Sequence, residues 1–564
     1  MRKTALIALL SVFALAGTEA GTGAGHARRF LVRIPKDRRI AHALNRLTFG
    51  PRPGDAAAIQ KTGLNKWIDL QLHPERIPEN PALTARLQTL DTLNMPAVEM
   101  VRDYPEPQTV RQMVTGQFPF PADPDRRMLI RKLVERYEKK QGQGAPQVPS
   151  AEPLSDILSA DEIHRLRTGA PAERLAALEA MPVEKQDDVI VALGPPMRQA
   201  LFAVAPPVMR RKIELANGPA QVVARDLAEA KILRAIYSNR QLAEVLDDFW
   251  FNHFNVFLEK GADRYLVTEY ERDAIRPLVL GKFRDLLEAT AKSPAMLFYL
   301  DNWQSAAPDR TPPRGNPNRP RRGLNENYGR ELMELHTLGV NGGYTQKDVT
   351  EVARCFTGWT IDQPNRGGGF VFNARLHDNG EKLVLGVRIP AGGGENDGER
   401  VLDILARHPS TAHFISRKLA IRFVADDPPA SLVDCMAATF LKTDGNIGEV
   451  LRTMLRSKEF WSEGAYLGKM KSPFEMVASA VRAVNGNVDY AFPLVNQVAQ
   501  LGEPLYRKAE PTGYSNAGAE WLNSGGLLGR MNFALQLADG KIPGVKAEFP
   551  QPATALASPD FQKK

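Results

Sequence analysis

Ionisable and amide side chains are unusually dense in residues 325–340 of this sequence. The members that could do chemistry are Asn327, Arg330, Glu331 and Glu334. Their spacings of three, one and three place them on one stripe of a helix. The simplest interpretation is an exposed stripe in which Arg330 pairs with Glu334, worth only a few tenths of a kcal/mol. The segment that follows favours a functional interpretation instead.

That following segment predicts a second polar helix. Residues 345–348 read Thr-x-x-Asp, the pattern of an N-terminal capping box, and Asp348, Glu351 and Arg354 then recur every third residue. The glycine-rich segment 339–343 allows the two helices to pack as a hairpin with their acidic stripes together. Such a cluster is a buried ion-pair network, a metal site or an acid–base site with shifted pKa values. The predicted polar network comprises Asn327, Arg330, Glu351, Arg354 and Trp359.

Histidine is scarce, so its positions are informative. His253 lies in an aromatic run, Phe-Trp-Phe-Asn-His-Phe, and His377 precedes Asp378 at a predicted turn. No pair has the His-Glu-x-x-His spacing or another standard zinc spacing. A lone helical histidine among aromatic residues is more often a hydrogen-bonded core residue than a ligand. His253 and His377 are nevertheless the leading candidates for ligands or proton carriers. The candidate catalytic residues are therefore Glu331, Glu334, Asp348, His253 and His377.

Other motifs restrict the chemistry. There is no Gly-x-Ser-x-Gly elbow, no phosphate-binding loop and no Cys-x-x-Cys-His for covalent haem. The two cysteines, Cys355 and Cys435, are too far apart in sequence for their pairing to be decided, and Cys355 lies in an apolar helical setting typical of a buried thiol. Lys and Arg are interleaved with Asp and Glu, without the basic, aromatic-rich run that indicates nucleic acid binding.

The elements that position these residues are almost all helices. With 564 residues the chain is too long for one hydrophobic core. We expect a mainly helical, all-α fold with a small β-hairpin, formed by 370–372 and 383–385 around the turn Asp378-Asn379-Gly380. The predicted units are an N-terminal helical part of the core (28–105), a helical insertion (106–230), the main helical core with the polar motifs (231–536) and a C-terminal tail (537–564). Longer helices are expected at 241–258 and 281–300.

The N-terminus has the pattern of a secretory signal peptide. Arg2 and Lys3 precede a short apolar run, and small residues follow with cleavage expected after Ala20 or Ala27. Residues 1–27 are therefore excluded from the fold. No later segment reaches membrane-spanning length. The mature chain is expected to be exported, to the periplasm or beyond.

Several long motifs resemble one bacterial family. They are the segment from Asn325 through Tyr344-Thr345, Thr357-Gly358-Trp359, the aromatic run around His253, His377-Asp378 with Lys382, His408-Pro409 with Lys418-Leu419, Pro511-Thr512-Gly513-Tyr514, Trp521, and the closing 557–562. Together they resemble the "domain of unknown function 1800" family and cover most of the chain outside 106–230. The resemblance implies an exported protein of unassigned activity and a partner from a second exported family, domain of unknown function 1501. Members often carry Phe in place of His336, which favours His253 and His377 over His336.

Two functional hypotheses remain open on the sequence. The first is a cell-envelope enzyme, a metal-assisted hydrolase built on the candidate residues. The second is a non-enzymatic envelope or secretion component in which the same residues form a structural network. A non-covalent haem site is a third and weaker option, since it leaves no short motif. The sequence assigns no cofactor and no substrate.

Overall fold

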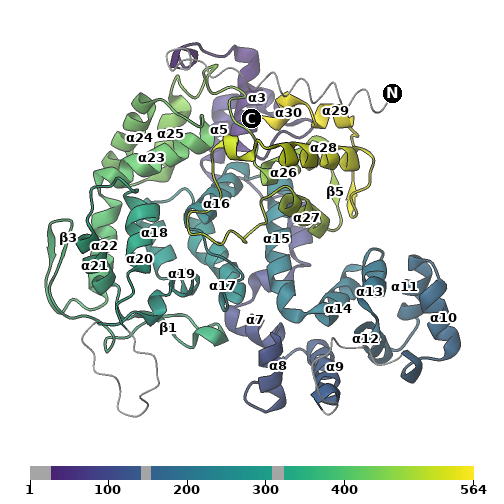
Figure 1. Cartoon of the computed structure of the whole chain (residues 1–564). Coiled ribbons are helices and arrows are strands. Elements are labelled where there is room, and N and C mark those ends of the chain that lie inside the picture. Colours follow the sequence, from purple (N-terminus) through teal and green to yellow (C-terminus); the bar gives the residue numbers. More distant parts are fainter. Residues whose placement is uncertain (1–26, 142–153, 308–322) are drawn as a thin grey trace.

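The structure is a computed structural model that describes residues 27–141, 154–307 and 323–564 (Figure 1). The expected signal peptide and most of the glycine-rich linker at 141–146 lie outside the described residues. The described chain is mainly helical, with three small two-stranded sheets, which confirms the expected fold class. None of the described helices combines the length and apolar character needed to cross a membrane.

The N-terminal part of the core consists of short helices. They are α3 (Arg39–Leu47), α4 (Asp55–Thr62), α5 (Leu64–Gln71), α6 (Pro81–Leu87) and α7 (Ala97–Asp103), with 3₁₀ turns η1 (Lys36–Arg38), η2 (Pro74–Arg76) and η3 (Asp91–Asn94).

The predicted insertion is also a set of short helices, and proline marks where most of them begin. They are α8 (Pro107–Val114), α9 (Pro124–Gln141), η4 (Leu154–Asp156), α10 (Ala160–Thr168), α11 (Pro171–Glu179), α12 (Val183–Ala192), α13 (Pro195–Phe202) and α14 (Pro207–Asn217). Proline suits the first helical position, where its missing N–H is not needed. Helices α10 to α13 form a lobe beside the main body (Figure 1).

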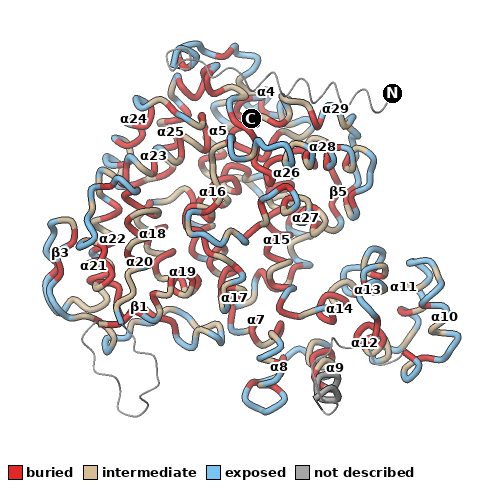
Figure 2. The backbone as a smooth tube through the Cα atoms, in the orientation of Figure 1, coloured by how far each residue is buried: buried red, intermediate tan, exposed pale blue. Residues whose placement is uncertain are grey.

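The long helix α15 (Pro219–Tyr237) crosses the predicted boundary at residue 230. It runs through the middle of the molecule and packs against α6, α14, α26 and α27 (Figure 1). Buried residues are concentrated along α15, whereas α10 and α11 carry mostly exposed and intermediate ones (Figure 2). Helix α15, which the predicted boundary divides between the insertion and the main core, is therefore a central element of the core.

The main core continues after α15. The helices of the core and of the C-terminal tail that follow are α16 (Gln241–His253), α17 (Asp263–Glu269), η5 (Tyr270–Ile275), η6 (Arg276–Leu278), α18 (Phe283–Ala291), α19 (Pro294–Tyr299), η7 (Asn302–Gln304), α20 (Asn327–Glu331), η8 (Leu332–Thr337), α21 (Gln346–Cys355), η9 (Pro364–Arg366), α22 (Asn396–Ala406), α23 (Pro409–Phe423), α24 (Ala430–Lys442), α25 (Ile447–Arg456), α26 (Pro473–Ala483), α27 (Phe492–Gln500), η10 (Gly518–Trp521), α28 (Ser524–Ala538), α29 (Ala553–Leu556) and α30 (Pro559–Gln562). Both η5 and η8 are π-helical.

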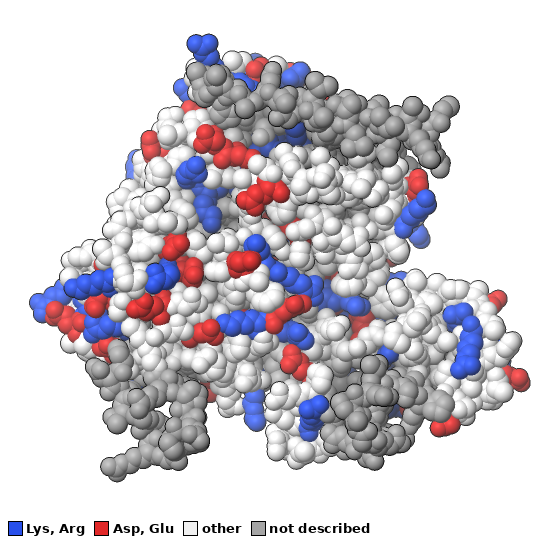
Figure 3. Space-filling model, viewed as in Figure 1, with Lys and Arg blue, Asp and Glu red and all other residues white. Residues whose placement is uncertain are grey.

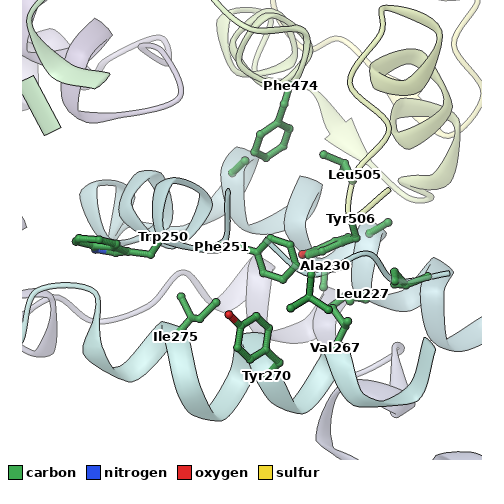
Figure 4. Packing of buried hydrophobic residues seen from close by; sticks show 14 of the residues in the cluster. Leu227, Ala230, Trp250, Phe251, Val267, Tyr270, Ile275, Phe474, Leu505 and Tyr506 are labelled. Atoms are coloured by element: carbon green, nitrogen blue, oxygen red, sulfur yellow. The ribbon is translucent and has the colours of Figure 1, made fainter. Parts of the chain in front are cut away.

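Aromatic side chains fill the centre of this core. Phe251 and Tyr506 meet edge-to-face with their ring centroids 4.8 Å apart, and Tyr270 lies beside them (Figure 4). Such contacts add about 0.5–1.5 kcal/mol per pair to the burial of the rings. They join α16 to the 501–514 segment, which holds one of the sequence motifs.

The predicted β-hairpin was wrong, because its two segments do not pair with each other. Strand β2 (Phe370–Phe372) pairs with β1 (Trp359–Ile361), and β3 (Lys382–Val384) pairs with β4 (Val387–Ile389). The turn at Asp378 therefore connects two separate sheets. The predicted helix at 281–300 is two helices, because Pro294 starts α19 and cannot continue α18. The C-terminal tail is packed, since β6 (Val545–Lys546) pairs with β5 (Asn487–Val488).

Candidate functional site

The two polar helices pack against each other as the sequence predicted. Helices α20 and α21 are in contact, and Gly329 of α20 faces Val349 and Ala353 of α21. A Cβ atom at Gly329 would lie 3.1 Å from the Ala353 nitrogen and 3.2 Å from the Val349 oxygen. Thr345 caps α21 through a capping box with Asp348. The acidic stripes, however, do not lie together.

The stripe on α21 holds the loop that contains β3. Asp348 accepts a hydrogen bond from the Leu385 N–H at 2.9 Å, and Glu351 accepts one from the Leu383 N–H at 2.9 Å. Arg354 bridges Glu351 and Asp378, with nitrogen–oxygen distances of 2.8 Å to each. Burial opposes ionisation of Asp348, but hydrogen bonds from Thr345 and Leu385 lower its pKa. Every carboxylate on this stripe thus has a structural partner.

The stripe on α20 and η8 lies apart from Arg354. Arg330 pairs with Glu326 at 3.6 Å and donates to Gln346, so the predicted Arg330–Glu334 pair does not form. Asn327 donates weakly to the Leu300 carbonyl, at 3.4 Å. Burial, and next the neighbouring Glu334, raise the pKa of Glu331.

The Tyr344 hydroxyl donates a hydrogen bond of 3.4 Å to Glu334. No described ion pair joins Glu331 or Glu334 to a cation.

His377 belongs to a closed polar cluster under β3. Its Nε2 lies 3.2 Å from Asp397 Oδ2, and Lys382 Nζ lies 2.6 Å from the same oxygen. The three side chains are fully buried. The other imidazole nitrogen, Nδ1, lies 2.8 Å from the Thr357 carbonyl oxygen, which fixes the ring. A buried charge pair of this kind costs several kcal/mol when one partner is removed.

Trp359 is buried beside this cluster. Its ring packs on Phe356 and Phe370, with Lys292 over it at 5.5 Å. Its indole N–H has no hydrogen-bond partner among the described residues. It therefore contributes packing to the predicted polar network.

His253 meets two other basic side chains. Its Nε2 lies 3.0 Å from the His336 carbonyl oxygen, and its Nδ1 lies 2.7 Å from Lys418 Nζ. Burial, and then Lys418, lower the pKa of His336 to about 3. The candidates Asp348, His377 and His253 thus lie in separate groups, and no three described His, Cys, Asp or Glu side chains are grouped so that they could hold a metal ion. Cys355 is buried and Cys435 exposed, and both are free thiols.

A cavity of about 450 Å³ lies elsewhere, where α6, α14 and α15 meet the 488–491 segment. This volume is in the range of small-molecule sites. Apolar residues including Leu90, Leu233 and Val488 form part of its wall. The polar and charged residues that line it are Arg86, Thr89, Arg210, Arg211, Glu214, Asp226, Glu229, Asp489 and Tyr490.

Most of the charged side chains around this cavity form ion pairs. Arg211 contacts Glu214 at 3.0 Å and Asp226 at 2.9 Å, and Arg225 contacts Glu214 at 2.8 Å. Arg210 uses its Nε for the Phe202 carbonyl and lies over the Tyr490 ring at 5.2 Å, without a carboxylate partner in the described ion pairs.

Glu229 is the exception among the carboxyl groups. It is 5% exposed, and it accepts a hydrogen bond from the Ala491 N–H at 3.1 Å. No cation forms an ion pair with it in the described chain. Burial, and then Glu214 and Asp226, raise the pKa of Glu229 to about 8. At neutral pH it is therefore a carboxylic acid that can donate a proton into the cavity.

Sequence reasoning missed this site because the cavity lies at the boundary of the predicted insertion. A signal was present, since the charged residues Arg225, Asp226, Glu229, Lys231 and Arg234 lie among apolar residues such as Val222, Val223, Leu227 and Ile232 on one helix. Charged residues on a helix that is apolar all round must find partners in the interior. The partners on α14 lie within residues 106–230, which the sequence predicted to be an insertion separate from the main core.

The comparison with known families agrees with the motifs in α20 and α21, which we call the signature helices. Residues 42–562 match the family model described as "Protein of unknown function (DUF1800)". The chain belongs to the DUF1800 family. The bounds of the match enclose residues 106–230, so within this DUF1800 chain both the signature helices and the Glu229 cavity lie inside the matched region. No curated protein and no solved structure is similar to the chain.

Proposed function

We propose that this DUF1800 chain is an exported hydrolase of the cell envelope that works at the cavity between α6, α14 and α15. The observation that carries the proposal is Glu229, a buried carboxyl group that forms no ion pair within the described residues and lines a cavity of about 450 Å³. A carboxyl group kept protonated near neutral pH can protonate a leaving group as the bond to it breaks.

The other lining residues supply the remaining roles. Asp489 is a half-exposed carboxylate in the same wall and is the candidate base for the attacking water. Arg210 and the Tyr490 ring bind and orient the substrate. Export is supported by the N-terminal sequence pattern. The partner from the domain of unknown function 1501 family is proposed from the family resemblance, and co-purification tests it.

The proposal is tested with aryl glycosides, aryl esters and envelope glycan fragments as substrates. Glu229→Gln keeps the shape of the side chain and removes its acidic proton, so kcat is expected to fall by about 10²–10⁴-fold. Wild-type activity is expected to decline as the pH rises through about 8, because Glu229 then loses its proton.

The matched control is Glu75→Gln, whose side chain is 65% exposed and does not line the cavity. It should leave kcat unchanged. Equal activity of the Glu229→Gln variant and the wild type, on any substrate that is turned over, would rule out the assigned role.

A non-enzymatic function is the second candidate, and one observation favours it. The signature carboxylates Asp348 and Glu351 both accept backbone hydrogen bonds from the β3 segment, and Arg354 ties Glu351 to Asp378. These family motifs therefore have a sufficient structural reason to be present. Absence of turnover across all three substrate classes would favour this candidate.

A further inference from the structure

Three basic side chains meet between α16, η8 and α23, and no acidic side chain among the described residues pairs with them. His253 ends α16, His336 lies in η8, and Lys418 is in the middle of α23. Lys418 Nζ is 2.7 Å from His253 Nδ1 and 5.4 Å from the centroid of the Phe414 ring. The buried Nε2 of His336 has no hydrogen-bond partner among the described residues. None of the described ion pairs includes Lys418.

The hydrogen bonds fix where the protons lie. A carbonyl oxygen can only accept, so the contact of 3.0 Å between His253 Nε2 and the His336 oxygen requires a proton on Nε2. Burial, followed by Lys418 and His336, lowers the pKa of His253 well below its usual value, so the ring is neutral. Its Nδ1 then carries a lone pair that accepts from Lys418. Burial also lowers the pKa of Lys418 to about 8.

Lys418 differs from the other lysines in the interior. Lys231, Lys382 and Lys469 each form an ion pair with an aspartate. Lys471 also lacks an ion pair, but its Nζ lies 4.0 Å over the Phe561 ring and the residue is only 4% exposed. Lys418 as a whole residue is half-buried, whereas Lys471 is buried.

We propose that Lys418 is a nucleophilic amine that condenses with a small carbonyl compound, with His253 as the group that relays the proton. The Nζ lone pair attacks the carbonyl carbon and forms a carbinolamine. Loss of water then leaves an imine, and both amine hydrogens depart in that water molecule. His253 Nδ1 takes the proton from the attacking nitrogen and returns it to the departing oxygen. The buried His336 Nε2, without a hydrogen-bond partner among the described residues, favours a small carbonyl compound with a second polar group, such as a 2-oxo acid.

Glyoxylate and borohydride test the proposal on the intact mature chain. Borohydride reduces an imine to a stable secondary amine, which peptide mass spectrometry locates. At pH 7 we expect Lys418 to be labelled at least about tenfold faster than Lys546, whose side chain is 82% exposed. Lys471 serves as the buried control and should remain unlabelled. Labelling of Lys418 no faster than that of Lys546 would overturn the proposal.

The role of His253 has its own readout. His253→Gln is expected to slow labelling of Lys418 while labelling of Lys546 stays the same, and Lys418→Arg should abolish the labelled peptide. Circular dichroism shows whether each variant is folded. If His253→Gln does not fold, His336→Phe leaves the Lys418–His253 contact in place and should retain fast labelling. Loss of labelling in a folded His336→Phe variant would contradict the relay through His253. Hydrolase activity at the Glu229 cavity is a separate measurement, so the two proposals fail independently.

Discussion

At the scale of single residues, the chain contains two kinds of buried ionisable group. Asp397 and Lys382 neutralise each other at 2.6 Å, as do Asp226 and Arg211 at 2.9 Å. Glu229 and Lys418 have no such partner in the described part of the chain, and burial moves the pKa of each toward neutrality, to about 8 in both cases. Groups that titrate near pH 7 without a structural partner are candidates for function, because nothing in the fold requires their charge.

The state of Glu229 can be tested without a substrate. Its pKa is about 8 in the folded chain and near 4.5 when unfolded, so between these values the folded state holds a proton that the unfolded state has released. The free energy of unfolding should therefore fall as pH rises through this window, by at most about 1.4 kcal/mol per pH unit. Glu229→Gln removes this dependence. Thermal unfolding at pH 5, 6.5 and 8 should show the variant gaining stability over the wild type toward pH 8. With Glu75→Gln as control, parallel curves for Glu229→Gln and the wild type would contradict the raised pKa.

At the scale of elements, one glycine determines how closely the signature helices approach. Helices α20 and α21 pack with Gly329 against Val349 and Ala353, and each helix directs its charged stripe elsewhere. The stripe on α21 then anchors β3, and through β3 it covers the buried His377 cluster. The hairpin of helices is therefore a support for the strands.

Gly329→Ala should disrupt this packing. The added Cβ would lie 3.1 Å from the Ala353 nitrogen, so the two helices must separate, at an expected cost of about 1–3 kcal/mol in the free energy of unfolding. The control is Gly525→Ala in α28, where the nearest atom to a new Cβ is 3.6 Å away. That substitution should be neutral or stabilise by up to about 1 kcal/mol. Equal stability of the Gly329→Ala variant and the wild type in urea unfolding would show that the helices do not meet at this glycine.

At the scale of the whole molecule, α14 and α15 join the helical lobe to the core. Arg211 on α14 contacts Asp91 at 3.2 Å and Asp226 on α15 at 2.9 Å, and the Glu229 cavity lies along the same junction. Surface charges of both signs are interspersed over the visible face (Figure 3). The buried charges at this junction are the more specific attachment, because exposed pairs contribute little.

Arg211→Met should loosen the lobe. It leaves Asp226, which is 1% exposed, without its cation and is expected to cost about 3–5 kcal/mol. Chymotrypsin should then cleave the 160–205 region faster, while fragments of the main core persist. Arg165→Met, an exposed substitution in the lobe itself, should leave the cleavage rate unchanged. Uniform acceleration of cleavage over the whole chain would indicate that Arg211 stabilises the entire fold and has no special role at the lobe.

The sequence by itself determined the helical fold class, the capping box at Thr345, the packing of the two signature helices and the family, because these depend on local spacing and on long motifs. Strand pairing around Asp378 and the end of α16 at His253 were decided by tertiary contacts, which local propensity does not encode. The same holds for the candidate sites. His253 was recognisable as a position, but its partner Lys418 lies 165 residues later in sequence. Glu229 acquires its raised pKa only because the folded chain buries it and places Glu214 and Asp226 nearby. Burial is a property of the assembled chain, and it is burial that turns an ordinary glutamate or lysine into a candidate for chemistry.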